Sequence, residues 1–192
     1  MKPFEYLQLK WRAIAWLVIG RHATALETFD QMAQRWPDDP YVLASRVHLL
    51  GEAGRTADAL EASSRLVTVQ PDNAGHWFNR GYMLEAAERW DEALAAFRHA
   101  IELSPKLDRA WYGMGLVLIR LGRLEEAVTA LERNTKLQPM SPYGWYQLAR
   151  VHVDRQQPEE AVKVIQHLRG FEPKVAAQLE RETGLIVGPS AS

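Results

Sequence analysis

The residues able to do chemistry form none of the arrangements that a catalytic or metal site requires. The sequence has six histidines and no cysteine, which excludes disulfides and thiolate ligands. No two histidines stand four residues apart around a carboxylate, the spacing of a helical zinc site. Gly113 and Gly115 form a tight glycine pair, but no strand precedes them as in a nucleotide-binding loop. We therefore expect no enzymatic activity, no metal and no cofactor.

The remaining polar candidates have structural interpretations. Glu125-Glu126 and Glu159-Glu160 begin predicted helices, where acidic side chains complement the helix dipole. His152 falls on an apolar helix face, which favours a buried histidine with a hydrogen-bond partner over a ligand. We therefore expect these residues to stabilise the fold and to take part in no reaction.

The elements that position these residues follow a repeat of 34 residues. The recurring residues are Trp77, Trp111 and Trp145; Gly81, Gly115 and Ala149; Ala25, Ala59, Ala93, Ala127 and Ala161; and Pro37, Pro71, Pro105, Pro139 and Pro173. A period in this range is typical of solenoids. Within 108–141, apolar spacing predicts one helix over 109–120 and another over 124–137, joined by a glycine turn.

At these positions the sequence resembles the tetratricopeptide repeat family, whose unit is a helix–turn–helix of 34 residues. The resemblance implies an all-α solenoid of antiparallel hairpins that form a right-handed superhelical arch. It gives a single domain, 1–192. The five expected repeats are 6–39, 40–73, 74–107, 108–141 and 142–175, followed by a capping helix over 175–183 and a tail over 184–192.

Several local contacts are also expected. Asp39, Asn73 and Ser141 precede predicted helices and are good N-cap residues. Trp111 is expected to be a buried knob between hairpins, with a truncation cost of about 3–5 kcal/mol. Arg12, Arg46 and Arg80 repeat at 34 residues, and we expect a structural ladder paired with acidic residues of adjacent helices.

The family resemblance places partner binding on the concave face formed by the first helix of each hairpin. It implies that the chain is a scaffold or adaptor that binds a peptide or helix of another protein there. Tyrosines and arginines on that face favour a partner with acidic and apolar side chains. The expected groove residues are Phe78, Asn79, Tyr82, Arg109, Tyr112, Tyr143, Tyr146, Gln147 and Arg150.

The first helix of the first repeat has apolar residues on nearly all sides. Such a helix is normally buried, yet at the end of an array it would expose Leu7, Trp11, Ile14 and Leu17. Exposed apolar patches usually mark an interface. The alternative function is therefore a self-assembling structural protein that forms homo-oligomers through this repeat. Two other possibilities are docking of a partner helix and coverage by residues 1–5 or a kink.

The charge balance and the hydropathy of the sequence exclude some other functions. With 23 basic and 24 acidic residues, the chain lacks the basic excess that drives nucleic-acid binding. The apolar run 13–20 is too short to span a bilayer. It loosely resembles a signal peptide, but Ala25, Phe29 and Pro37 keep the repeat register beyond it. Cleavage would remove half a repeat, so we expect a cytoplasmic protein without nucleic-acid partners or membrane insertion.

Overall fold

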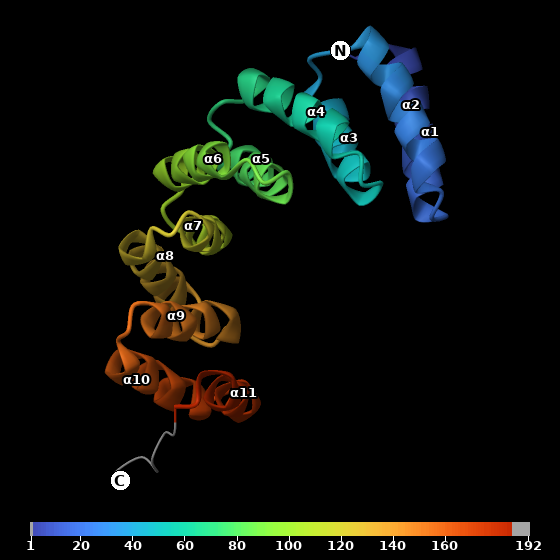
Figure 1. Ribbon diagram of the computed structural model, residues 1–192. Helices are drawn as coiled ribbons and strands as arrows, with labels where there is room; N and C mark the ends of the chain where they lie inside the picture. Colours follow the sequence, from blue (N-terminus) through green and yellow to red (C-terminus); the bar gives the residue numbers. More distant parts are fainter. Residues whose placement is uncertain (1, 186–192) are drawn as a thin grey trace. The chain divides into compact units, whose positions relative to one another are not determined.

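The computed structural model describes residues 2–185, and these residues form eleven α-helices and no strand (Figure 1). The chain divides into two compact units, with the boundary between Arg89 and Trp90. Of the predicted tail over 184–192, residues 186–192 lie outside the described residues, as does Met1. The all-α prediction is confirmed for the part of the chain described.

The first unit contains five helices, each packed against the next along the chain. They are α1 (Phe4–Val18), α2 (His22–Arg35), α3 (Pro40–Glu52), α4 (Thr56–Val69) and α5 (Ala74–Ala86). Short turns join α1 to α2 and α3 to α4, so each of these pairs is an antiparallel hairpin (Figure 1).

The second unit contains six helices, again in sequential contact, with α11 also lying against α9. They are α6 (Trp90–Leu103), α7 (Asp108–Arg120), α8 (Leu124–Leu137), α9 (Pro142–Asp154), α10 (Pro158–Arg169) and α11 (Pro173–Thr183). α7 and α8 match the helices expected within 108–141 to within one residue. α11 begins two residues before its expected start, because proline is favourable in the first helical turn.

The turn between the two helices of each repeat contains one residue in the left-handed conformation, and these residues share one register. Gly20, Gly54 and Gly122 have φ of 75°, 70° and 70°, and Glu88 and Gln156 both have φ of 58°. Glycine adopts this conformation without the steric cost that a Cβ brings. The left-handed residue therefore recurs at the same register in all five described turns, although two of them lack glycine.

Two of the three predicted N-caps are present. The Asp39 carboxylate accepts a hydrogen bond from the Val42 N–H at 3.1 Å. Asn73 caps α5 in the same way, accepting from Gly75 and His76. The prediction for Ser141 is wrong, since its hydroxyl makes no capping bond and α9 relies on Pro142 in its first turn.

Asp39 is also the centre of a buried polar cluster at the start of α3. Its carboxylate accepts from the Tyr6 hydroxyl at 3.2 Å and from Lys2 Nζ. Burial raises the pKa of Asp39, but the hydrogen bonds from Lys2, Val42 and Tyr6 outweigh it and the net pKa is lowered. Burial and the Asp39 charge raise the pKa of Tyr6 to about 12.

Small residues let the helices approach closely. The five register alanines are fully buried, at 0% exposure. A Cβ built on Gly115 of α7 would lie 2.8 Å from Cγ and Cδ2 of Leu131 in α8. A Cβ on Gly113 would lie 2.6 Å from the ring of Phe97 in α6. This confirms that Gly115 is small because the two helices of its hairpin meet there.

Trp111, expected to be a buried knob between hairpins, is only partly buried. Trp77, Trp111 and Trp145 are all half-buried. Each indole Nε1–H donates instead to the carbonyl of the proline six residues earlier. The bonds run from Trp77 to Pro71 at 2.7 Å, from Trp111 to Pro105 at 2.9 Å and from Trp145 to Pro139 at 2.9 Å. Each tryptophan therefore fixes the loop that precedes its own helix.

The arginine ladder pairs with a more varied set of groups than expected. Arg46 bonds to Asp30 of α2 at 2.7 Å, as predicted. Arg12 instead donates to Gln31 at 2.7 Å, and Arg80 donates to the Ser64 hydroxyl. The role is structural in each case, because these bonds join neighbouring helices.

Candidate functional site

A concave surface of the first unit lies between α3 and α5, with the start of α4 at its base. It encloses about 590 Å³, and we call it the α3–α5 cavity. Three predicted groove residues, Phe78, Asn79 and Tyr82, line it together. The other lining residues are Ala44, Val47, His48, Gly51, Glu52, Thr56, Ala59, Met83 and Ala86. Most of these are apolar, so the cavity fits an apolar side chain of a ligand.

One end of the α3–α5 cavity is acidic. Glu52 lies at the C-terminal end of α3 and contacts two histidines. Its carboxylate is 2.7 Å from Nδ1 of His22 and 3.3 Å from Nε2 of His48. All three side chains are largely exposed, so the carboxylate also has access to ligand donors. This end suits a cationic or amide group of a ligand.

A second concave surface lies in the second unit, where the start of α7, the end of α8 and the start of α9 meet. It encloses about 570 Å³, and we call it the α7–α9 cavity. Three further predicted residues, Arg109, Tyr112 and Tyr143, line it. Asp108, Asn134, Gln138 and Ser141 complete the lining. Each of these seven side chains carries a polar group, so the lining offers both donors and acceptors.

Sequence reasoning missed Asn134 and Gln138 because it placed ligand contacts only on the first helix of each hairpin. Asn134 occupies a register slot that Ala100 and Leu168 fill in other repeats. It is buried and donates from Nδ2 to the Asp108 carbonyl at 3.0 Å. Its side chain would overlap a Cβ at Gly144. The sequence could have indicated this contact, because Asn134 is polar in a register position that is apolar in those repeats.

The last three predicted residues, Tyr146, Gln147 and Arg150, lie on α9 outside both cavities. The Tyr146 hydroxyl donates to the Glu182 carboxylate of α11 at 2.6 Å. That hydrogen bond is the main reason that the pKa of Tyr146 is raised and the pKa of Glu182 lowered. The Arg150 guanidinium lies 5.8 Å from the centre of the Tyr146 ring. This tyrosine therefore already has a partner within the chain.

The predicted interface residues of α1 divide into two groups. Leu7 and Trp11 are exposed, whereas Ile14 and Leu17 are half-buried. Leu17 packs against the core of the first unit. Phe4, Val18 and Ile19 are also exposed, so the apolar surface extends over the length of the helix.

His152 is buried, and its Nδ1 lies 3.1 Å from the Gln157 side-chain oxygen, as expected for a structural histidine. Within residues 2–185, no three histidine or carboxylate side chains gather closely enough to hold a metal ion. No helix in this part of the chain has the length and hydropathy needed to cross a bilayer.

Comparison with protein families identifies the repeat. Two tetratricopeptide repeat models match the chain, one over residues 45–108 and the other over 84–146. Together they span just over half of its length. No curated protein matches the chain significantly in sequence.

Solved structures with the same fold cover nearly the whole chain. MamA residues 41–end from Desulfovibrio magneticus is 19% identical, with a TM-score of 0.81 over 95% of this chain and 98% of that chain. YrrB, described as a TPR protein with an unusual peptide-binding site, is 16% identical, with a TM-score of 0.77 and 88% of each chain covered. A thermophilic TPR protein from Thermus thermophilus is 20% identical, with a TM-score of 0.62 over 93% of this chain and 97% of that one. These likenesses establish an α-solenoid fold.

Proposed function

Because the chain belongs to the tetratricopeptide repeat family, we propose that it is a protein-interaction scaffold that binds a peptide or helix of another protein and catalyses no reaction. The observation that carries the proposal is the α3–α5 cavity, where an apolar wall meets an acidic end. YrrB, which has a similar fold, is described as having a peptide-binding site, and this likeness supports the same class of ligand.

The α3–α5 cavity defines the first feature of the partner segment. Phe78, Met83 and Val47 would contact one apolar side chain of leucine or methionine size, and exposed Tyr82 would cover it from the rim. Asn79 would hydrogen-bond the partner backbone. A lysine, arginine or amide of the partner would then meet Glu52.

The second unit indicates the charge of the partner side chains that it would bind. Arg109 in the α7–α9 cavity and exposed Arg150 on α9 favour acidic side chains. Tyr112 and Tyr143 supply rigid contact area beside Arg109 at a small entropic cost. The second unit by itself therefore suits the acidic side chains expected from sequence, whereas the first unit by itself suits an apolar anchor beside a basic or amide group. Short segments bound in this way have dissociation constants of about micromolar order.

A displayed peptide library selected on the purified chain tests the proposal. Selected peptides should share an apolar anchor, and calorimetry should show binding weakened about tenfold by Tyr82→Ala, as for loss of a well-packed contact of about 1.4 kcal/mol. Glu52→Gln should weaken those peptides that carry a basic residue beside the anchor. Met140→Ala is the matched control, since Met140 is exposed and lines neither cavity. Equal binding to the wild type and to Tyr82→Ala would refute the assignment.

A further inference from the structure

Helix α1 exposes an apolar stripe with the spacing of a helix-pairing seam. Phe4, Leu7, Trp11, Ile14 and Val18 follow one another at intervals of three and four residues, the alternation found in coiled coils. Phe4, Trp11 and Val18 are 76%, 65% and 81% exposed. The opposite side of α1 carries Tyr6 and Ala13, which are buried in the first unit. The helix therefore has one face packed within the chain and a second apolar face in solvent.

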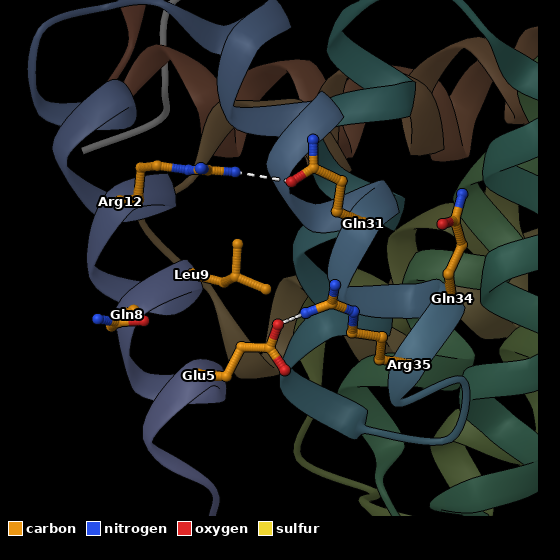
Figure 2. A pocket seen from close by; sticks show the side chains of 7 residues that line it. All are labelled: Glu5, Gln8, Leu9, Arg12, Gln31, Gln34 and Arg35. Carbon is orange, nitrogen blue, oxygen red and sulfur yellow. Dashed lines mark hydrogen bonds and ion pairs between the residues drawn. The ribbon is translucent and has the colours of Figure 1, made fainter.

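The charged side chains of α1 turn away from this stripe. Glu5 forms an ion pair with Arg35 of α2, and Arg12 donates to Gln31 of α2, as Figure 2 shows. Lys10 Nζ lies 4.3 Å from the centre of the Tyr41 ring in α3. Every charged residue of α1 is thus held by a neighbouring helix, and the stripe is left without a charge of its own.

We propose that the stripe docks a second copy of this chain, so that α1 of one protomer packs along α1 of the other about a two-fold axis. A two-fold interface must be complementary to itself. An uncharged apolar seam meets this condition, because two copies bring no like charges together. A different protein would be selected by complementary charges at the seam edges, and α1 commits its charges to internal contacts.

The exposed area is sufficient for such a dimer. With side-chain areas of roughly 150–250 Å² for the large residues, the exposed fractions along α1 amount to about 500 Å² per protomer. A symmetric pair would bury about 1,000 Å² in total, the lower limit for a specific interface. The expected dimer is therefore reversible, with a dissociation constant of about micromolar order.

A membrane surface fits the stripe less well. Helices that lie on membranes carry free lysines and arginines beside the apolar face, where they meet anionic lipid. Lys10 and Arg12 are instead bound to Tyr41 and Gln31. The dimer also differs from the proposed peptide binding, since no residue of the stripe lines either cavity.

Sedimentation equilibrium of the full chain between about 1 and 100 μM tests the proposal. The wild type should pass from monomer to dimer over this range. Trp11→Glu should weaken association by about a hundredfold or more, since symmetry buries two unpaired carboxylates. Met140→Glu is the matched control, because Met140 is 69% exposed and far from α1 in sequence, and it should dimerise like the wild type. Circular dichroism confirms that each variant is folded.

Two results would overturn the proposal. One is a wild type that remains monomeric at the highest concentration, and the other is a Trp11→Glu variant that associates as well as the wild type. Co-sedimentation of the monomer with phosphatidylglycerol vesicles, abolished by Trp11→Glu, would replace the second copy with a lipid surface.

Cysteine cross-linking locates the contact independently. The chain has no native cysteine, so Leu7→Cys introduces a single thiol into the stripe. A short bis-maleimide should join two Leu7→Cys chains covalently, whereas Tyr143→Cys, at an exposed position in the second unit, should give no cross-linked product. Equal cross-linking of both variants would indicate random collision and contradict docking through α1.

Discussion

Replacing Gly115 with alanine changes two opposing contributions to the free energy of unfolding. Gly115 lies inside α7, where alanine is favoured over glycine by about 1 kcal/mol. Its new methyl group, however, would lie 2.8 Å from two carbons of Leu131. Leu131 is fully buried, so it cannot swing into solvent to make room.

Steric overlap should outweigh the helix preference at this site. Adding a methyl group to a well-packed core costs about 1–3 kcal/mol. Subtracting the propensity gain leaves a net destabilisation of about 1 kcal/mol. Gly51 is the matched control, because its Cβ would meet only the flexible Met83 methyl, at 3.3 Å. Gly51→Ala should therefore stabilise the protein by about 0.5–1 kcal/mol.

Urea unfolding followed by circular dichroism measures both variants, and hydrogen exchange reports locally on α7 and α8. The midpoint should fall for Gly115→Ala and rise for Gly51→Ala. Amides of α7 and α8 should exchange faster only in the first variant. If Gly115→Ala raised the midpoint as much as Gly51→Ala, the close approach of α7 and α8 would be wrong.

Three further predictions concern turns, caps and loops. Glu88→Gly should raise the free energy of unfolding by up to about 1 kcal/mol, and with it the urea midpoint, because glycine removes the cost of a left-handed Cβ. Asp39→Asn should cost about 1–2 kcal/mol at neutral pH, because asparagine can still cap α3 but loses the charge-assisted bonds from Lys2 and Tyr6. Since the folded pKa of Asp39 is lowered, this stabilisation is complete above the ordinary pKa of about 4 and disappears as pH falls through the lower folded value. Urea titrations at pH 7 and pH 3 should show the difference between wild type and variant shrink. Trp111→Phe should cost about 1 kcal/mol by removing the bond to Pro105, and an unchanged midpoint would contradict that role.

The repeated residues explain how much of the fold could be predicted. Pro139 ends a helix and Gly122 forms a left-handed turn through their own backbone chemistry. Ala127 is buried because its slot recurs on one helix face. Such local causes act within a few residues, so the 34-residue spacing was enough to place the helices and turns.

The candidate site was less predictable because its contacts join residues far apart in sequence. Phe78, Asn79 and Tyr82 could be grouped from the repeat register, but their cavity also depends on Glu52 and its histidine neighbours. Tyr146 occupies the register of Tyr112, yet only Tyr146 is bound by α11. The 34-residue register therefore predicts which positions are equivalent. It does not predict what each side chain contacts, because those contacts depend on neighbouring helices.

The indole-to-proline hydrogen bonds give three repeats an intrinsic fluorescent reporter. Trp77, Trp111 and Trp145 each span the loop that joins one hairpin to the next. Indole emission responds to the loss of such a bond and to hydration of the ring, so opening of a single loop would change the spectrum before the helices melt. The chain has seven tryptophans, so variants that retain one of these three and carry phenylalanine at the other six positions would allow the order in which the junctions open to be followed without any added dye.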